Sequence, residues 1–528
     1  MKWLLVILAA CGGKSEPFDP GTGTETDTEP PTTTDVPTTV PTTEDTDVPT
    51  DPPDPCGMAP GMAVLTADVA RPWHENEVEI AVTLSQAATL AVQCTLQADP
   101  TEIHLVESAA TATDHTVRIA GLLGGTTYDC VAAPVCPTVD GEPLAFTIET
   151  QPANPILPNT KVVGTGGGTE YILANHSDDC AWKTQRLVIF DRMGRSRWWY
   201  STPEWVGPSV EFRYHGLNQL QWGGGWEANS DGRPRKLDLF DGQVYDSALA
   251  MPDVGDSEYH HDGKQLADGR LLTLEEVEVR GGDGDWFTGF QVRRVDPVTN
   301  LVDFTYDSQR AVDEGHLPEG FGDAWHANWM DIAIVDGREV LAVSFCFLQQ
   351  VAFVDVATGD WLGLFGANQD FSLTDAGGAP LGPDGFSQCQ HGLEFTGSEL
   401  LVYDNGVNRG ASRASEYSLD FTTFEAVRLW TWTEPDWYES TLGDVDYLPS
   451  GNILVGMGHA ECFSSNPGDN TTIVEIDPVA GAKLWEMKYT VKGEMAYRAD
   501  FADACTLFAN AAYCPEVATR LAELALAF

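Results

Sequence analysis

A weak internal repeat in the second part of the chain constrains its fold more than any other sequence feature. One recurring unit is a short apolar strand that ends in Asp before a Gly-containing turn, as at residues 187–191 and 351–355. A second unit is Leu, a small polar turn and another apolar strand, as at residues 266–272 and 448–454. Repeats of about 40–60 residues built from strands and turns are typical of propeller blades. We therefore predict an all-β fold with a six-bladed β-propeller over residues 160–500.

The segment before the repeat, residues 58–152, alternates apolar and polar side chains in short runs separated by turn residues. This period of two predicts the strands of a small β-sandwich. The turn LLGGTTY, which ends at Tyr128, resembles the entry to strand F of fibronectin type III domains, where Tyr128 would be the tyrosine-corner residue. Cys94 and Cys130 would then lie on neighbouring strands, which a disulfide could join. We predict a fibronectin type III-like spacer or docking module.

The chain opens with a pattern typical of exported proteins. Lys2 precedes an apolar run that is too short to cross a bilayer of about 30 Å. The tetrapeptide LAAC, which ends at Cys11, resembles the lipobox of bacterial lipoproteins, in which the Cys is lipidated. We predict a lipoprotein signal peptide over residues 1–11 and a membrane anchor at Cys11. Because Gly12 follows rather than Asp, we expect the outer membrane or cell surface, a periplasm-facing position included. An ordinary cleaved signal is the alternative.

Residues 12–57 consist mainly of Thr, Pro, Asp and Glu. Such a run buries too little apolar area to offset its ordering entropy, so we predict a disordered, extended linker. The whole chain carries 80 acidic and 29 basic residues, a formal charge of -51. Because phosphate binding needs clustered Lys and Arg, we expect no nucleic-acid partner. Composition leaves the oligomeric state open.

Of the eleven cysteines, ten remain when Cys11 is set aside, and an even number suits disulfides in an oxidising compartment. They form no C-x-x-C pairs of the kind that predicts a zinc site, and we expect neither a metal nor a cofactor. The last residues, 501–528, include two of these cysteines and end in Ala-Leu-Glu repeats. This tail could form a short helix packed on the propeller, and we assign it no function.

Three histidine clusters lie at matching points of successive predicted blades, around His261, His326 and His391. The strand that opens each blade lines the central channel, so residues at its start converge on one mouth. Histidine is suited to proton transfer and nucleophilic attack near neutral pH. When the blades are aligned on their turns, His261, rather than His260, is the residue equivalent to His391. Two other interpretations of the three histidines remain. They could form hydrogen bonds between blades, or their imidazoles could bind a metal.

The ordered set of motifs in this region resembles the bacterial arylsulfate sulfotransferases. The matching pieces are residues 260–262 with 266–272, residues 325–328, residues 390–391 leading into 401–406, and residues 409–417 and 497–499. The resemblance covers about residues 160–500. It implies a six-bladed propeller with an added N-terminal β-domain. It also implies transfer of a sulfuryl group from a phenolic sulfate ester to a phenol, by a ping-pong route through a sulfohistidine and without a nucleotide donor. The partners would be a small aryl sulfate and a phenol.

The resemblance also implies roles for individual residues. His391 would be the nucleophile, while His326 and His261 would bind sulfate oxygens or move a proton. The implied catalytic set is His391, His326, His261, His260 and Asn328, and the implied substrate-binding set is Arg409, Arg413 and Trp325.

One position departs from the family pattern. The family usually has an Arg in the strand after the Trp-x-His-x-Asn motif, and Cys346 stands there in this chain. A bidentate cation for the sulfate would then be missing. Arg409 or Arg413 could replace it, and Cys346 could pair with Cys389. Two alternatives to an enzyme follow: a non-catalytic, surface-anchored binding propeller for an aromatic or anionic ligand, and a structural or adhesive surface protein.

Overall fold

The computed structural model describes most of the chain beyond the predicted linker. The described residues are 64–70, 75–108, 110–135, 143–166, 168–177, 185–201, 211–214, 219–223, 235–238, 244–245, 258–266, 268–282, 284–296, 298–458, 470–491 and 494–524. Only the backbone is described at residues 65, 185, 211–214, 219–223, 235–238, 244–245, 258–260 and 506. The predicted signal peptide (1–11), its Cys11 and the predicted linker (12–57) lie outside the described residues and stay predictions.

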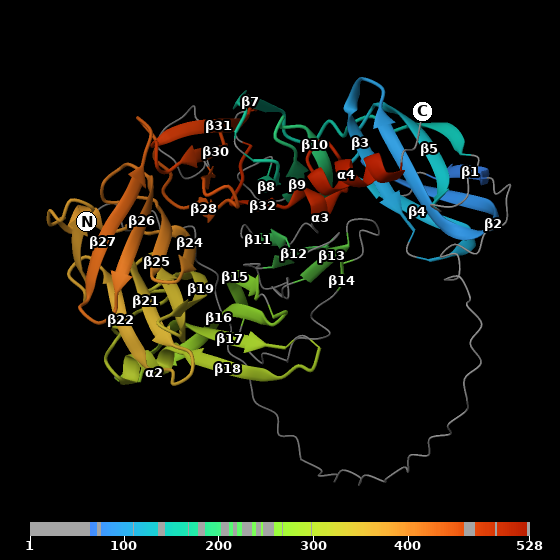
Figure 1. Ribbon diagram of the computed structural model, residues 1–528. Coiled ribbons are helices and arrows are strands. Elements are labelled where there is room, and N and C mark those ends of the chain that lie inside the picture. Colours follow the sequence, from blue (N-terminus) through green and yellow to red (C-terminus); the bar gives the residue numbers. More distant parts are fainter. Residues whose placement is uncertain are drawn as a thin grey trace, which may run out of the picture. The chain divides into compact units, whose positions relative to one another are not determined.

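Six strands form a β-sandwich in the first part of the described chain (Figure 1). They are β1 (Val64–Ala70), β2 (Glu77–Leu96), β3 (Asp99–Glu107), β4 (Ala112–Ala120), β5 (Thr127–Val135) and β6 (Leu144–Glu149). The first half of β2 pairs with β1 and β4, whereas its second half pairs with β3 and β5. This long strand therefore belongs to both layers. Its alternating burial follows the apolar–polar pattern of the sequence, because side chains of a strand point to opposite faces.

Two local features of the sandwich match the sequence predictions. The Tyr128 hydroxyl accepts the backbone N–H of Leu123 at 2.9 Å and donates to Glu102 Oε1 at 3.0 Å. This bond back to the preceding turn is the one that a tyrosine corner makes. Cys94 and Cys130 face each other on β2 and β5 and form a disulfide. Kinship with fibronectin type III domains stays a prediction.

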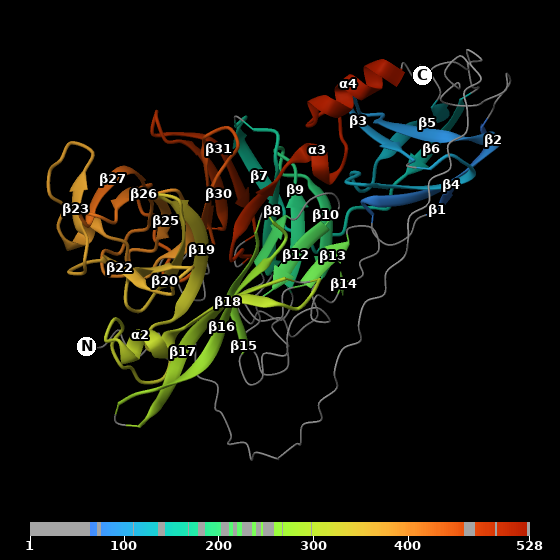
Figure 2. The same ribbon diagram turned by 60° about the horizontal axis from the view of Figure 1, so that its bottom comes forward.

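Within the described residues, six further sheets form the blades of a propeller (Figures 1 and 2). Blade 1 is β32 (Ala499–Ala502), β8 (Tyr171–Ser177), β9 (Gln185–Phe190) and β10 (Ser196–Ser201). Blade 2 is β11 (Glu211–Tyr214), β12 (Gln219–Gly223), β13 (Arg235–Asp238) and β14 (Val244–Tyr245). Blade 3 is β15 (Glu258–Gln265), β16 (Leu271–Arg280), β17 (Trp286–Val295) and β18 (Val302–Asp307). Blade 4 is β19 (Ala327–Val335), β20 (Arg338–Phe345), β21 (Gln350–Asp355) and β22 (Trp361–Gly366). Blade 5 is β24 (His391–Thr396), β25 (Glu399–Asp404), β26 (Arg413–Asp420), β27 (Glu425–Trp432) and β23 (Ser372–Asp375). Blade 6 is β28 (Asp444–Tyr447), β29 (Ile453–Met457), β30 (Thr472–Asp477), β31 (Ala482–Tyr489) and β7 (Thr160–Gly164). The predicted all-β propeller is confirmed.

Both ends of the propeller segment close its ring. β32, from the C-terminal side, pairs with β8 as the innermost strand of blade 1. β7, from the N-terminal side, pairs with β31 as the outermost strand of blade 6. β32 also lies beside β11 and β28, the innermost strands of the two neighbouring blades. The residues just before β32, Tyr497 and Arg498, are thereby brought to the ring of inner strands that carries the histidines.

Apolar side chains fill the spaces between blades. Phe290, Trp325 and Phe345 belong to a buried cluster that joins blades 3 and 4. Phe353 and Phe395 belong to a second cluster, which joins blades 4 and 5. Burial of this apolar area is the main stabilising term for such a ring, because each blade alone would leave both faces in water.

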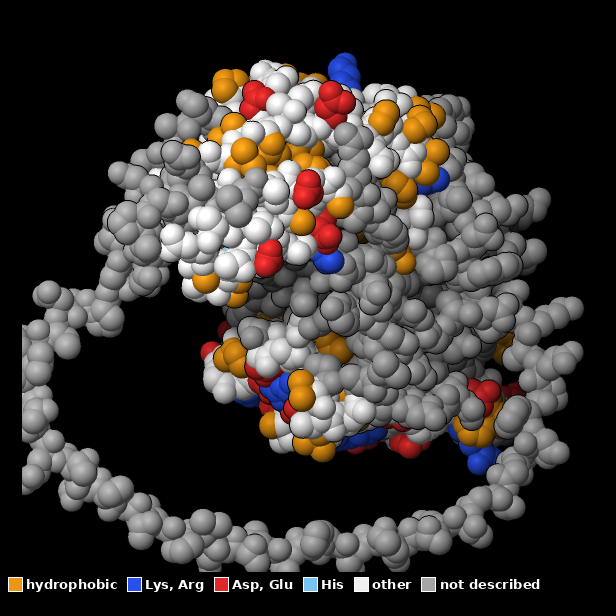
Figure 3. Space-filling model, turned by 90° about the vertical axis from the view of Figure 1, so that its right-hand side faces the viewer, with side chains coloured by type: hydrophobic (Ala, Val, Ile, Leu, Met, Phe, Trp, Pro, Cys, Tyr) orange, Lys and Arg blue, Asp and Glu red, His pale blue; other side chains and the backbone are white. Residues whose placement is uncertain are grey.

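The described helices are short. They are α2 (Ser308–Asp313), α3 (Ala504–Leu507), α4 (Pro515–Leu524) and the 3₁₀ turn η2 (Pro383–Gly385). The tail contains the helix α4, which buries no residue and whose Arg520 pairs with Glu107 of the sandwich strand β3, whereas the sequence predicted a helix packed on the propeller. Cys505 and Cys514 beside it form a disulfide. No helix in the described part of the chain has the length and hydropathy of a membrane-spanning segment. Figure 3 shows one face, on which isolated Lys and Arg side chains lie beside Asp and Glu.

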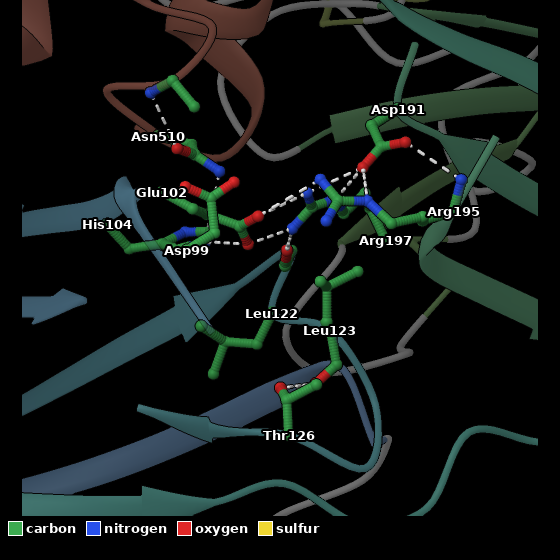
Figure 4. Close-up of polar contacts among 12 residues, drawn as sticks. Asp99, Glu102, His104, Leu122, Leu123, Thr126, Asp191, Arg195, Arg197 and Asn510 are labelled. Atoms are coloured by element: carbon green, nitrogen blue, oxygen red, sulfur yellow. Dashed lines mark hydrogen bonds and ion pairs between the residues drawn. The ribbon is translucent and has the colours of Figure 1, made fainter. Parts of the chain in front are cut away.

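A buried ion cluster joins the sandwich to blade 1 (Figure 4). Arg197 of β10 is fully buried and donates to Glu102 of β3 at 2.5 and 2.9 Å, and to Asp191 at 2.8 Å. Burial alone would raise the pKa of Glu102, but the hydrogen bonds and charge of Arg197 and His104 outweigh it and hold that pKa well below its usual range. The sandwich is therefore fixed to the propeller by charged side chains that water does not reach.

Candidate active site

Three of the predicted histidines lie on the innermost strands of consecutive blades. His261 is in β15, His326 directly precedes β19, and His391 opens β24. These strands lie side by side around the propeller axis. In each strand the pairing register shifts close to the histidine, between Tyr259 and Gly263, between Ala327 and Trp329, and between His391 and Leu393. Such bulges re-aim side chains and are common beside active sites.

A left-handed backbone conformation recurs at or beside these histidines. His261 and His326 have φ angles of 54° and 51°, in the left-handed region that costs a non-Gly residue about 1–3 kcal/mol. Beside His391 the left-handed residue is Gly392, with φ 54°. A Cβ at Gly392 would meet backbone atoms of Asp444 and Val445 at 2.8 and 2.9 Å. The fold therefore maintains strained backbone at His261 and His326, as functional sites often do, whereas beside His391 a glycine takes the left-handed conformation without strain.

His391 is held in one tautomer by Asn405. The Asn405 side-chain N–H₂ donates to the carbonyls of Glu439 and Leu442 at 2.9 and 2.8 Å, which turns its Oδ1 toward His391. That oxygen lies 2.8 Å from His391 Nδ1, so Nδ1 must carry the hydrogen and donate. In the neutral imidazole the lone pair is then on Nε2.

The surroundings of His391 keep its imidazole neutral. Burial lowers its pKa to about 3, and the charges of His326 and Arg498 act in the same direction. Hydrogen bonds to Asn405 and to the Cys389 backbone oppose this lowering without offsetting it. A neutral, oriented imidazole with its lone pair on Nε2 is a competent nucleophile at physiological pH.

His261 and His326 form a pair next to His391. Their Nε2 atoms are 3.1 Å apart, and their rings meet edge to face. His326 Nδ1 lies 2.5 Å from Asp323 Oδ2, and Asp323 also accepts the backbone N–H of His326 at 2.9 Å. His261 Nδ1 lies 3.4 Å from the hydroxyl of Tyr497. Four polar side chains thus form one hydrogen-bonded series across blades 3 and 4 and the closing segment.

The closing segment contributes Tyr497 and Arg498. Their backbone N–H groups both donate to Asn175 Oδ1, at 2.7 and 3.1 Å, which fixes the segment against β8. The Tyr497 ring is parallel to that of His261 and edge-on to that of His391. Arg498 forms an ion pair with Asp262 at 3.3 Å, and its guanidinium lies over the Trp329 ring. Arg498 is buried, and its charge acts on His391.

Asn328 supports the His391 strand. Its Nδ2 donates to the carbonyl of Gln390, the residue before His391, at 2.9 Å. Its Oδ1 accepts from Ser344, so both ends of the amide are fixed. Cys346 forms a disulfide with Cys389, as the sequence allowed. The backbone N–H of Cys346 donates to the carbonyl of His326, so this disulfide ties the His326 segment to the approach to His391.

Other predicted site residues are placed elsewhere or only in part. Trp325 is buried in the core between blades 3 and 4, where its Nε1 donates to the Pro318 carbonyl. Arg409 and Arg413 both donate to the buried carboxylate of Asp404, at 2.9 and 2.7 Å, and also to nearby carbonyls. These contacts are those of structural side chains rather than of a sulfate clamp. Only the backbone of His260 is described.

Among the described side chains, the group whose ligand atoms lie close enough to share a metal ion is Cys505, Cys514 and Glu516. The two cysteines form a disulfide, so neither offers the thiolate that a metal such as zinc requires. The three histidines are not part of such a group in the described residues.

A known family matches the segment of the chain that contains these residues. The arylsulfotransferase (ASST) family profile matches residues 167–498, well over half of the chain. The chain belongs to the arylsulfotransferase (ASST) family. Membership supports a sulfotransferase that acts on small aryl compounds, and the matched range contains every histidine of the site together with Tyr497 and Arg498.

Comparison with curated proteins gave no match. Solved structures similar to this family member include a protein described as a 6-phosphogluconolactonase from Bacteroides fragilis, with 11% identity, a TM-score of 0.35 and coverage of 79% of this chain and 98% of that one. Another is the Cps50 (Swd1) β-propeller domain from Myceliophteria thermophila, with 11% identity, a TM-score of 0.32 and coverage of 63% and 90%. A third is AztD from Citrobacter koseri, with 11% identity, a TM-score of 0.25 and coverage of 79% and 98%. We draw no functional conclusion from these likenesses.

Sequence reasoning gave no role to four members of this arylsulfotransferase site: Asn405, Asp323, Tyr497 and Arg498. Asn405, Tyr497 and Arg498 stood in motifs that carry the family resemblance, and Asp323 is only three residues before His326. An i, i+3 carboxylate before a candidate catalytic His is a signal that could have identified Asp323. Asn405 contacts His391 across two neighbouring strands. The sequence does not show which residues of those strands lie opposite each other, so this contact could not be predicted from it.

Proposed function

We propose that this chain transfers a sulfuryl group from a phenolic sulfate ester to a phenol through a sulfohistidine on His391, without a nucleotide donor. The single observation that carries the proposal is the state of His391: buried, neutral and oriented by Asn405 so that Nε2 holds the lone pair. Neutral imidazole attacks sulfur well and leaves well, which divides one difficult transfer into two easier ones.

In the first half-reaction, His391 Nε2 attacks the sulfur of the aryl sulfate. The N–S bond forms as the S–O bond to the aryl oxygen breaks, and that electron pair leaves with the phenolate, which is then protonated. In the second half-reaction, the oxygen of an acceptor phenol attacks the same sulfur and loses its proton. The N–S electron pair returns to Nε2, so His391 is neutral again. Arg498 and an imidazolium at His326 would offset the charge of the sulfuryl oxygens.

Steady-state kinetics with a chromogenic aryl sulfate and phenol test this proposal. We expect release of the chromogenic phenol to depend on added phenol, with parallel double-reciprocal lines, because a ping-pong route separates donor from acceptor. Intersecting lines would contradict a covalent intermediate. No release with several donors, disulfides intact, would contradict sulfuryl transfer itself.

Asn405 supplies a prediction about tautomer control. In Asn405→Ala the imidazole loses the acceptor at Nδ1, and we expect kcat/KM to fall about 10²-fold because the nucleophile is no longer oriented. In Asn405→Asp a carboxylate at the same place favours the imidazolium, so the pKa of His391 rises. The acid limb of the kcat/KM profile then moves to higher pH than in the wild type. Identical pH profiles for Asn405→Asp and the wild type would refute this role.

A non-catalytic binding propeller is the second candidate, and Cys346 favours it. The family Arg is replaced there by a disulfide cysteine, so that position offers no cation to a sulfate. This alternative predicts saturable binding of an aromatic or anionic ligand with no covalent intermediate. A sulfated His391 would eliminate it.

We also propose that Cys11 anchors the protein to the outer membrane or cell surface as a lipoprotein. The residues concerned lie outside the described part of the chain, and the LAAC sequence supports the proposal. A single thiol-linked lipid modification would place the protein in the membrane fraction of a cell that expresses it. We expect Cys11→Ser to move the protein to the soluble exported fraction. Membrane retention of Cys11→Ser, measured by fractionation, would refute anchoring through that thiol.

A further inference from the structure

We propose that Asp323, His326, His261 and Tyr497 form a proton relay that serves sulfuryl transfer at His391, with Asp323 as a positioning residue. The inference rests on the proposed function and adds to it the path of the proton. Sulfuryl transfer between phenols moves one proton from the acceptor phenol to the leaving phenolate. The buried His391 cannot carry that proton, because its Nδ1–H is committed to Asn405 and its Nε2 bonds to sulfur.

The hydrogen bonds of the series have one consistent direction. His326 Nδ1 must donate to the Asp323 carboxylate, because an ionised carboxylate is only an acceptor. With both imidazoles neutral, His326 Nε2 then accepts, so His261 Nε2 must donate to it. His261 Nδ1 is left as an acceptor for the Tyr497 hydroxyl. Along these four side chains, the hydrogens all point from Tyr497 toward Asp323.

This direction lets the series hold one extra proton. When a phenol gives its proton to the Tyr497 oxygen, the hydroxyl hydrogen of Tyr497 passes to His261 and the Nε2–H of His261 passes to His326. His326 is then an imidazolium whose Nδ1–H faces the Asp323 carboxylate, and a charge of opposite sign stabilises it. The reverse sequence returns the proton to a leaving phenolate. In the ping-pong order, the protonated series first gives its proton to the leaving phenolate and is then refilled by the acceptor phenol. It therefore holds the proton, as an imidazolium at His326, from the end of one turnover to the start of the next, and is neutral while His391 carries the sulfuryl group.

In the proposed relay Tyr497 is the end that exchanges a proton with the substrate, because its ring is near that of the nucleophile. The ring centroid of Tyr497 is 6.3 Å from that of His261 and 6.1 Å from that of His391. At the other end, Asp323 is held by the loop before β19, next to Thr288 of β17. The side chains of Asp323 and His326 are 19% and 10% exposed, which limits screening of their interaction by water.

The variant Asp323→Asn tests the relay. The quantity measured is the single-turnover rate at which each of two donors sulfates His391. With phenyl sulfate, whose leaving phenolate is basic, we expect sulfation of His391 to slow about 10²-fold, because protonation of the leaving group is lost. With 4-nitrophenyl sulfate, whose phenolate leaves without a proton, we expect the rate to change by less than about 3-fold. Asp313→Asn is the matched control, since this exposed carboxylate bonds to Gln309 in α2, and it should leave both rates unchanged.

Tyr497→Phe removes the other end of the series. We expect the same donor-dependent loss, and we expect the double variant with Asp323→Asn to be no slower than the slower single variant, since both break one path. Equal slowing of the two donors, or multiplied losses in the double variant, would overturn the relay while leaving the proposed function intact. Failure of 4-nitrophenyl sulfate to sulfate the wild type would overturn the proposed function instead.

Discussion

Replacing His391 with Ala is expected to lower sulfuryl transfer from an aryl sulfate by about 10⁴-fold or more, since removal of a covalent nucleophile leaves only binding and electrostatic contributions. The fold should tolerate the change, because the Asn405 side chain keeps its two bonds to backbone carbonyls. Turnover of a chromogenic aryl sulfate measures the effect, and circular dichroism checks the fold.

His316→Ala is the matched control for His391→Ala. His316 is exposed and stacks on Trp361, away from the three inner strands, so its removal should leave turnover unchanged. Turnover by His391→Ala within about 10-fold of the wild type would contradict the role of His391, because such a loss is far too small for a nucleophile.

Glu102→Gln is expected to destabilise the folded protein by about 3–5 kcal/mol, because it leaves the fully buried Arg197 with half of its compensating charge. The midpoint of guanidinium unfolding measures this loss. Glu107→Gln is the matched control on the same strand, β3. Its ion pair with Arg520 is partly exposed, so its loss should cost about 1 kcal/mol or less. Equal effects of the two substitutions would show that the buried cluster contributes no more than a surface pair.

The same cluster predicts how stability depends on pH. The pKa of Glu102 is lower in the folded protein than its ordinary value of 4.5, despite burial, because of Arg197 and His104. Below that ordinary value the unfolded state takes up a proton that the folded state refuses, so stability rises with pH there. The advantage of the wild type over Glu102→Gln should therefore be constant above about pH 4.5 and shrink below it. A difference that grows as the pH falls would contradict this account.

The fold was predictable from the sequence because its signals are local. Strands that end in Asp before a Gly turn recur, and each recurrence is one blade. The Cys94–Cys130 pairing and the Tyr128 bond to Leu123 matched expectations that came from the resemblance of this segment to fibronectin type III domains. Closure of the ring by β7 and β32 was not predicted, because two segments more than 300 residues apart carry no shared local pattern.

The site was predictable in its histidines but not in their partners. His261, His326 and His391 recur at equivalent blade positions, which periodicity reveals. Asn405 and Arg498 reach the site through neighbouring strands and the ring closure, which depend on register and tertiary packing. Trp325 was expected to bind substrate but is buried between blades 3 and 4, which its spacing from His326 does not reveal.

The most direct test of the central claim is intact-mass analysis of the purified protein after brief incubation with 4-nitrophenyl sulfate and no acceptor, followed by peptide mapping. We predict a mass gain of one sulfuryl group, located on the peptide that contains His391, lost when phenol is added and absent in His391→Ala. Release of 4-nitrophenol without a mass gain, or a sulfuryl group on any other residue, would contradict transfer through His391.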